Sequence, residues 1–277
     1  METRRFGPMD DKVPVIGQGT WQISDRAGAR EALDRGIRLG LTHIDTAEVY
    51  EGSEETIAPV IRDRRDEVFL VSKVRPGNAS YKGTLAACTR SLERLGTDHL
   101  DVYLLHWPSQ HPIEDTMRAM GELIDDGKIR AAGVSNFSVE DMEAAIEGLG
   151  KNRLVCNQVI YHLEERGVEV EVLPFCRDKG IALVGYSPFG SGRFPSSGSA
   201  GRKALDGIGK RHGKTARQVA LRFLTREAPL FAIPKAEKVR HVEDNAGGQG
   251  FTLDAEDLER IDEVFPVPEH VVGVPTI

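Results

Sequence analysis

The sequence predicts a closed barrel of eight parallel strands, each followed by a helix. Eight short apolar runs, most of them rich in valine, isoleucine and leucine, alternate with stretches of helical periodicity along the 277 residues. Such runs are too apolar for strands with one wet face, which indicates parallel strands covered on both sides. Strict alternation over eight units favours a (β/α)8 TIM barrel over an open sheet.

The elements follow one another in a regular order. Strands are predicted over Val15–Gly19, His43–Thr46, Val68–Val74, Leu100–His106, Ile129–Val134, Leu154–Val159, Ile181–Tyr186 and Leu230–Pro234. Helices are predicted over Ala27–Leu39, Ser53–Arg62, Lys82–Leu95, Pro112–Asp125, Ser138–Leu149, Glu169–Lys179, Thr215–Thr225 and Val239–Ala246. Ser53 is predicted to cap the second helix, which has two glutamates in its first turn.

Two further features lie outside this alternation. Thr3–Phe6 and Lys12–Val15 flank a turn-rich segment, and we expect an N-terminal β-hairpin that plugs the barrel floor. Arg202–Arg211 is predicted to be an extra helix. No linker or low-complexity tract divides the sequence, so residues 1–277 are predicted to form a single barrel domain.

Composition excludes several classes of function. The 36 basic and 43 acidic residues give a net charge of −7, which argues against nucleic acid or an anionic membrane as the partner. No apolar run approaches the ~18 residues of a membrane span, and the N-terminus lacks a signal peptide, so a cytoplasmic location is expected. Cysteine and histidine spacings predict no metal site, and the three cysteines are expected to be buried free thiols.

Polar residues fall at the ends of seven consecutive predicted strands. Because the carboxyl ends of barrel strands meet at one rim, where active sites of this fold lie, these side chains are expected to gather there. They are Asp45, Lys73, His106, Ser135 with Asn136, Gln158, Tyr186 and Lys235. A purely structural polar layer is the alternative, and Asp45 and Lys73 could be only a buried ion pair.

With Tyr50 on the loop after Asp45, the rim holds a carboxylate, a phenol, an ammonium and an imidazole. A tyrosine keeps its proton up to a pKa near ~10. Lys73, kept charged by Asp45, is expected to lower the pKa of Tyr50 and make it a proton donor to a developing alkoxide. A neutral His106 can orient the same carbonyl oxygen. Protonating that oxygen requires hydride at the carbon, which a cofactor must supply.

These residues lie in segments that resemble the motifs of the aldo-keto reductase superfamily. In order they are GQGTW, HIDTAEVYEGSEETIAPVI, VSKV, LLHWP, GVSNF, NQVIYH, GYSPFGSG and IPKAEKVRHVEDN, from about Gly17 to Asn245. The resemblance implies the barrel fold and NADPH-dependent reduction of a carbonyl group. It also implies that Asp45, Tyr50, Lys73 and His106 are the catalytic set, with Tyr50 as the general acid.

The resemblance carries further roles onto matching positions. Ser135, Asn136 and Gln158 match contacts of the nicotinamide carboxamide, and Tyr186 matches the ring that stacks on the nicotinamide. Other matches lie along the rest of the nucleotide and in the substrate pocket. They are Gly19 and Thr20 in the first motif, Ser187, Phe189 and Ser191 at the pyrophosphate, Lys235, Ala236, Arg240 and His241 near the 2′-phosphate, Asp244 and Asn245 at the adenine, and Trp21, Tyr50, His106 and Trp107 around the substrate.

The motif at the 2′-phosphate departs from the family at two positions. Ala236 replaces a common serine, and His241 stands where an arginine is common, with Arg240 one place earlier. Lys235 and Arg240 still supply two positive charges. NADPH is therefore expected as the cofactor, with NADH as a weaker alternative.

The resemblance is to compact bacterial members that reduce small aldehydes and α-dicarbonyls such as methylglyoxal. The tail Phe265–Ile277 is short, which implies an open pocket, and a monomer is expected. Two other functions are alternatives. One is a nucleotide-binding redox-sensing subunit, which resembles potassium-channel β subunits. The other is an aldolase that forms a Schiff base on Lys73 or Lys235.

Overall fold

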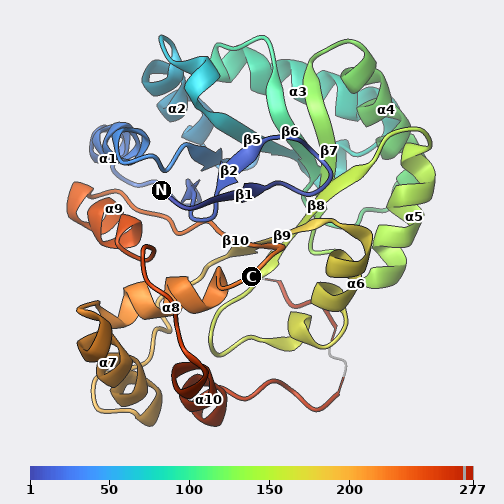
Figure 1. The fold of residues 1–277 in the computed structure, drawn as a ribbon. Helices are drawn as coiled ribbons and strands as arrows, with labels where there is room; N and C mark the ends of the chain where they lie inside the picture. Colours follow the sequence, from blue (N-terminus) through green and yellow to red (C-terminus); the bar gives the residue numbers. More distant parts are fainter. Residues whose placement is uncertain (271–272, 277) are drawn as a thin grey trace.

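Eight parallel strands form the central barrel in the computed structural model, which describes residues 1–270 and 273–276 (Figure 1). Each strand pairs with its neighbours in sequence order. The strands are β3 (Gln18–Gly19), β4 (His43–Asp45), β5 (Phe69–Val74), β6 (Leu100–Leu105), β7 (Ile129–Ser135), β8 (Leu154–Ile160), β9 (Ala182–Tyr186) and β10 (Leu230–Ala232). Parallel bridges from Ile16 to Ala232 and from Gly19 to Lys235 join the first strand to the last, which confirms the predicted barrel.

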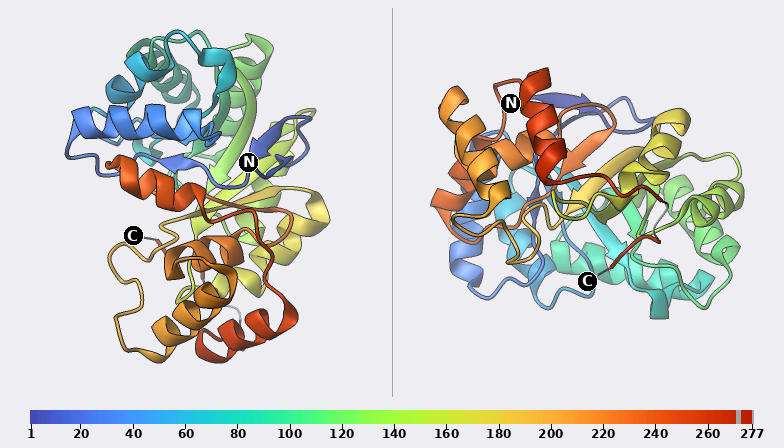
Figure 2. Two further views of the ribbon diagram at one scale, coloured as in Figure 1. Left: turned by 60° about the vertical axis from the view of Figure 1, so that its left-hand side comes forward. Right: turned by 90° about the horizontal axis from the view of Figure 1, so that it is seen from below.

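Helices surround the barrel and bury the outer faces of the strands (Figures 1 and 2). They are α1 (Arg26–Arg38), α2 (Ser53–Ile61), α3 (Tyr81–Leu95), α4 (Ile113–Asp125), α5 (Val139–Leu149), α6 (Val172–Lys179), α7 (Ala200–His212), α8 (Ala216–Leu224), α9 (Val239–Ala246) and α10 (Ala255–Val264). The predicted extra helix is α7. Helix α6 begins three residues later than predicted because Gly167–Glu169 forms a 3₁₀ turn.

The predicted cap of α2 is wrong. Gly52, with φ 68°, precedes the helix, and Ser53 is its first residue. The Ser53 hydroxyl instead accepts a hydrogen bond from the Thr46 hydroxyl at 3.0 Å and donates one to the Thr20 carbonyl at 3.4 Å. Ser53 therefore ties the start of α2 to the loops that follow β3 and β4.

The N-terminal hairpin closes one end of the barrel, as predicted. Strands β1 (Thr3–Arg5) and β2 (Lys12–Pro14) pair antiparallel across the barrel end (Figure 1). Phe6 is fully buried between the rings of Phe69 and Phe231, with centroids 4.9 and 5.0 Å away. Those two rings lie on β5 and β10, near the amino ends of the strands. The opposite rim is therefore the open end.

Helix α10 was not predicted. Asp254 and Asp257 form a capping box at its start, and α10 packs against α7. Of the tail Phe265–Ile277, residues 271, 272 and 277 lie outside the described residues. None of the helices in the described part of the chain is long and apolar enough to cross a membrane.

Candidate active site

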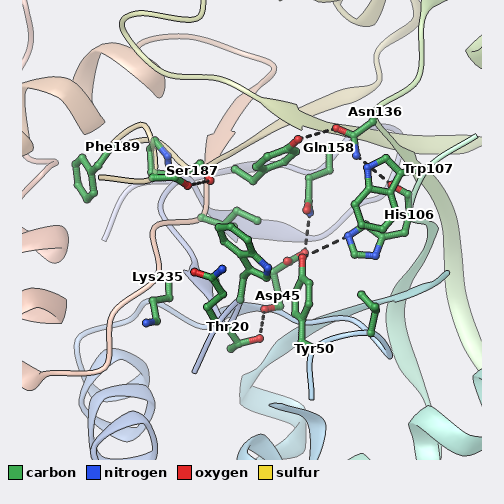
Figure 3. Close-up of a pocket in the computed structure, with 18 of the residues that line it drawn as sticks. Thr20, Asp45, Tyr50, His106, Trp107, Asn136, Gln158, Ser187, Phe189 and Lys235 are labelled. Atoms are coloured by element: carbon green, nitrogen blue, oxygen red, sulfur yellow. Dashed lines mark hydrogen bonds between the residues drawn. The ribbon is translucent and has the colours of Figure 1, made fainter. Parts of the chain in front are cut away.

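A cavity of about 610 Å³ opens at the carboxyl ends of the strands (Figure 3). Its wall contains residues from the loops after β3, β4, β6 and β9 and from the strand ends between them. The predicted residues that line it are Gly19, Thr20, Trp21, Asp45, Tyr50, His106, Trp107, Asn136, Gln158, Tyr186, Ser187, Phe189, Ser191 and Lys235. Some of the predicted site residues, all of which the structure describes, do not line this cavity. They are Lys73, Ser135, Ala236, Arg240, His241, Asp244 and Asn245.

Asp45 and Lys73 form a buried ion pair beneath the cavity. The Lys73 Nζ lies 2.6 Å from Asp45 Oδ1 and donates to the Thr46 carbonyl at 2.8 Å. Gln158 Nε2 donates to the other Asp45 oxygen at 2.7 Å. Each polar group of the pair is thereby hydrogen-bonded, as a buried charge requires.

Lys73 lies behind Asp45 with none of its surface exposed. Burial lowers the pKa of Lys73, whereas the Asp45 carboxylate opposes that effect. An amine buried in this way and hydrogen-bonded to two oxygens does not reach a substrate carbon. The geometry therefore argues against a Schiff base on Lys73.

Tyr50 and His106 meet at one end of the cavity. The Tyr50 hydroxyl lies 3.4 Å from His106 Nε2, and the two rings pack edge to face with centroids 5.5 Å apart. The Lys73 Nζ lies 5.2 Å from the centroid of the Tyr50 ring. Two of the four predicted catalytic side chains, Lys73 and His106, thus flank the Tyr50 phenol, and Asp45 holds the lysine below it.

The expected lowering of the Tyr50 pKa is wrong for this arrangement. Burial raises the pKa of Tyr50 above its ordinary value, and the negative charge of Asp45 raises it further. The ammonium of Lys73 faces the ring and hydrogen-bonds to Asp45 and to Thr46. The Tyr50 phenol therefore keeps its proton throughout the physiological range.

His106 is neutral at physiological pH. Burial lowers the pKa of His106 to about 2, and the charge of Lys73 contributes. Trp107 stacks on the imidazole with centroids 3.7 Å apart, so it both supports His106 and forms a wall of the cavity. Trp21 lines the same cavity.

A group of amides and hydroxyls from the ends of β7, β8 and β9 is joined by hydrogen bonds. The Tyr186 hydroxyl donates to Asn136 Oδ1 at 2.8 Å, and Asn136 Nδ2 donates to the His106 carbonyl at 3.0 Å. The Ser135 hydroxyl donates to the Gln158 carbonyl at 2.8 Å. Asn136 has a φ of 63°, and a non-glycine residue in this left-handed region is typical of functional sites.

The loop after β9 forms the opposite wall. Ser187 and Ser191 have left-handed φ values of 50° and 49°, and their hydroxyls are 3.0 Å apart. Phe189 lies beneath the guanidinium of Arg217, 4.8 Å from the ring centroid. Arg217 was not predicted, because an arginine of α8 carries no sequence signal of contact with this loop.

Lys235 lies at the far side of the cavity from Trp107 and Asn136 (Figure 3). Its Nζ is 3.1 Å from Glu237, which also accepts hydrogen bonds from backbone amides of Ser24 and Asp25. Neighbouring positive charges and partial burial lower the pKa of His241, with burial the largest cause. The positive charge at this end therefore comes from Lys235 and Arg240 more than from His241.

The remaining predicted nucleotide contacts lie after Lys235 in the chain, on α9 and at the first strand. Ala236 follows Lys235, and Asp244 and Asn245 lie on α9, where Asp244 accepts a hydrogen bond from the Thr215 hydroxyl at 3.1 Å. At the first strand, a Cβ on Gly19 would lie 2.7 Å from the Ile233 carbonyl oxygen, so glycine is needed there. The Thr20 hydroxyl donates to the Asp45 carbonyl at 2.8 Å.

Several lining residues were missed by sequence reasoning. Val49 is 45% exposed although it is a large apolar side chain, and Gln22 has a left-handed φ of 55°. Pro188, Gly192 and Ile233 complete the wall. Among residues 1–270 and 273–276, no group of three or more histidine, cysteine, aspartate or glutamate side chains could hold a metal ion.

Comparisons with known proteins show which family the chain is similar to. The Aldo/keto reductase family model matches residues 15–265. Methylglyoxal reductase YeaE of Escherichia coli is 40% identical over 94% of each chain, and glyoxal reductase of Bacillus subtilis is 36% identical over 94% of each. A Klebsiella pneumoniae aldo-keto reductase solved with NADPH is 38% identical, with a TM-score of 0.93 over 100% of this chain and 99% of that one. A structure of an aldo/keto reductase from the same organism in complex with NADP and acetate has a TM-score of 0.91, at 38% identity and with the same coverage. The chain therefore belongs to the aldo/keto reductase family.

Proposed function

We propose that this oxidoreductase reduces small aldehydes and α-dicarbonyls, such as methylglyoxal, with NADPH, and that Tyr50 donates the proton. The observation that carries the proposal is the meeting of the Tyr50 hydroxyl and the neutral His106 imidazole, 3.4 Å apart, on the wall of the cavity. A hydroxyl and an imidazole that converge on one point can both hydrogen-bond a single carbonyl oxygen.

The residues present fit a nicotinamide nucleotide. The amides of Asn136 and Gln158 match a carboxamide in donor and acceptor character, and the aromatic ring of Tyr186 lines the same cavity. Lys235 supplies a positive charge at the opposite side of the cavity, as a phosphate needs. When bound, the nucleotide supplies the hydride.

The chain's own residues then handle the proton. Tyr50 is protonated at neutral pH and releases its proton only as negative charge develops on the carbonyl oxygen. Because His106 is neutral, it directs that oxygen without adding a charge. Lys73, held by Asp45, lies 5.2 Å from the centroid of the Tyr50 ring and attracts the negative charge left on the phenol, an effect that burial and Asp45 outweigh before substrate reacts.

Two observations support NADPH over NADH. Lys235 is exposed in the cavity wall, and Arg240 adds a second exposed cation on the adjoining helix α9. Two similar proteins were solved with NADP or NADPH. Glu237 already pairs with Lys235, so part of that charge is neutralised and NADH remains a weaker cofactor.

The aromatic and apolar wall favours small carbonyl compounds. Trp21, Val49 and Trp107 line the cavity together with Tyr50, and Asp45 and Lys73 neutralise each other beneath it. The names of two relatives, a methylglyoxal reductase and a glyoxal reductase, point to the same class of substrate.

Two measurements on the purified protein test the proposal. The protein is first titrated with NADPH and with NADH, and binding is followed by nucleotide fluorescence. Methylglyoxal or 4-nitrobenzaldehyde is then added, and oxidation of the nucleotide is measured. The expected result is tight NADPH binding followed by its oxidation, with weaker use of NADH. Tight binding without oxidation would contradict the reductase role and favour a nucleotide-sensing subunit. Failure to bind either nucleotide would contradict both functions.

A further inference from the structure

The position of Tyr50 depends on the loop that carries it. Residues 46–52 connect β4 to α2, and two neighbours of Tyr50, Val49 and Glu51, are exposed. The Tyr50 hydroxyl itself makes one long contact, to His106. Thr46 and Ala47 anchor the start of the loop by burial, but the part next to Tyr50 is exposed and gains little from apolar burial, so polar contacts are needed to hold it.

Glu48 supplies these contacts. Its side chain is only 6% exposed although it is a charged residue of a surface loop. One carboxylate oxygen accepts the backbone N–H of Arg75 at 2.8 Å, and both oxygens lie 3.0 Å from Asn78 Nδ2. Charge-assisted hydrogen bonds of this kind are stronger than neutral ones.

These bonds extend the pairing of β4 with β5 beyond the strands. The Thr46 N–H donates to the Val71 carbonyl at 2.9 Å, and the Glu48 N–H donates to the Lys73 carbonyl at 3.2 Å. The Glu48 carboxylate then accepts the N–H of Arg75, two residues further along. The loop that carries Tyr50 is thus hydrogen-bonded to β5 at Val71 and Lys73 and to the turn after β5 at Arg75.

We propose that Glu48 is a positioning residue that holds the Tyr50 hydroxyl over Lys73 and against His106. The inference rests on the proposed function, since it assigns to Glu48 the placement of the proton donor. Its ion pair with Arg90 is longer, at 3.6 Å, and Arg90 is 45% exposed, so anchoring α3 is the lesser role.

Kinetics of Glu48→Ala, Glu48→Gln and Glu51→Ala test the inference. Glu51 is an exposed acid three residues further along the loop and serves as the matched control. Glu48→Ala should lower kcat by about tenfold or more, as expected when a reacting group is misplaced, while KM and the NADPH Kd change by less than about twofold. Glu48→Gln keeps an acceptor for Arg75 N–H and should recover most of kcat. Wild-type kcat in Glu48→Ala, or parallel losses of kcat and NADPH affinity, would overturn the inference.

A double-mutant comparison separates positioning from general damage. If Glu48 acts through Tyr50, Glu48→Ala should lower single-turnover hydride transfer far less in a Tyr50→Phe background than in wild type. Equal losses in both backgrounds would refute the inference. Hydrogen exchange should also quicken across residues 46–52 in Glu48→Ala and stay unchanged in Glu51→Ala. That measurement requires no turnover, so it decides the role of Glu48 in holding the loop even if wild type fails to oxidise NADPH and the proposed function falls.

Discussion

The hydroxyl of Tyr50 and Nε2 of His106 lie 3.4 Å apart, at the long end of hydrogen-bond range. Both groups are held in their neutral forms, because burial raises the pKa of Tyr50 and lowers the pKa of His106 to about 2. The cavity therefore presents a neutral donor and a neutral imidazole rather than a charged pair, and this electrostatic state determines how the site can be tested.

Tyr50→Phe should keep nucleotide binding and lose most reduction. The ring packing against His106 survives, whereas the proton donor is removed, and general acid catalysis contributes about 100-fold or more. Fluorescence titration should give an NADPH Kd within about twofold of wild type, and single-turnover oxidation should be at least 100-fold slower. Comparable activity in the variant would rule out Tyr50 as the general acid.

Lys235→Ala should weaken NADPH binding by about tenfold or more, because a charge-assisted contact to the 2′-phosphate is lost. NADH lacks that phosphate, so its Kd should change little. Lys179→Ala, at the end of α6, is the control and should alter neither. Equal losses for the two nucleotides would remove the proposed role of Lys235.

Acid should destabilise the fold through buried neutral histidines such as His43. Burial lowers the pKa of His43 to about 4, from 6.5 in its ordinary state, and both of its ring nitrogens lack a hydrogen-bond partner among the described residues. Between pH 6.5 and 4 the unfolded chain binds a proton that the native state does not, so stability falls as pH falls. The slope is at most about 1.4 kcal/mol per pH unit for this residue.

His43→Leu removes the imidazole that binds this proton in the unfolded chain, so it tests how much His43 contributes to the loss of stability in acid. Urea unfolding should show the variant gaining more stability over wild type at pH 5 than at pH 8. His106 and His162 remain, so some acid sensitivity should persist. The same difference between variant and wild type at both pH values would contradict the assignment.

Phe6→Ala should destabilise the protein by about 3–5 kcal/mol, as expected for loss of a fully buried aromatic ring. NADPH binding at the opposite rim should change by less than about twofold, if the floor acts on stability alone. Arg5→Ala is a control on the same hairpin, because its ion pair with Asp10 is exposed and worth at most about 1 kcal/mol. Urea unfolding of both variants measures the difference.

The strands and most helices could be predicted because their apolar runs and helical periodicity are local properties of the chain. The rim could be predicted because parallel barrel strands bring their carboxyl ends together, which places Asp45, Lys73 and His106 side by side. Helix α10 follows the last strand–helix unit, so the alternation that revealed the other helices gave no reason to expect it.

Other features depend on three-dimensional placement. The pKa of Tyr50 is set by how deeply its ring is buried and by which face Lys73 approaches, and neither can be read from spacing. The partners of Glu48 and Arg217 belong to other elements, β5 with its following turn and the loop after β9. Such tertiary contacts carry no local sequence signal.

Ser187 and Ser191 have left-handed backbone conformations, and at these positions the stability of the fold and the chemistry of the cavity wall favour different residues. A serine in that conformation costs on the order of 1 kcal/mol or more, a strain that glycine would relieve. Replacing these strained serines by glycine to raise thermal stability would therefore remove two hydroxyl groups from the cavity wall. Two positions where glycine would raise the stability of this protein are therefore among those proposed to contact the nucleotide.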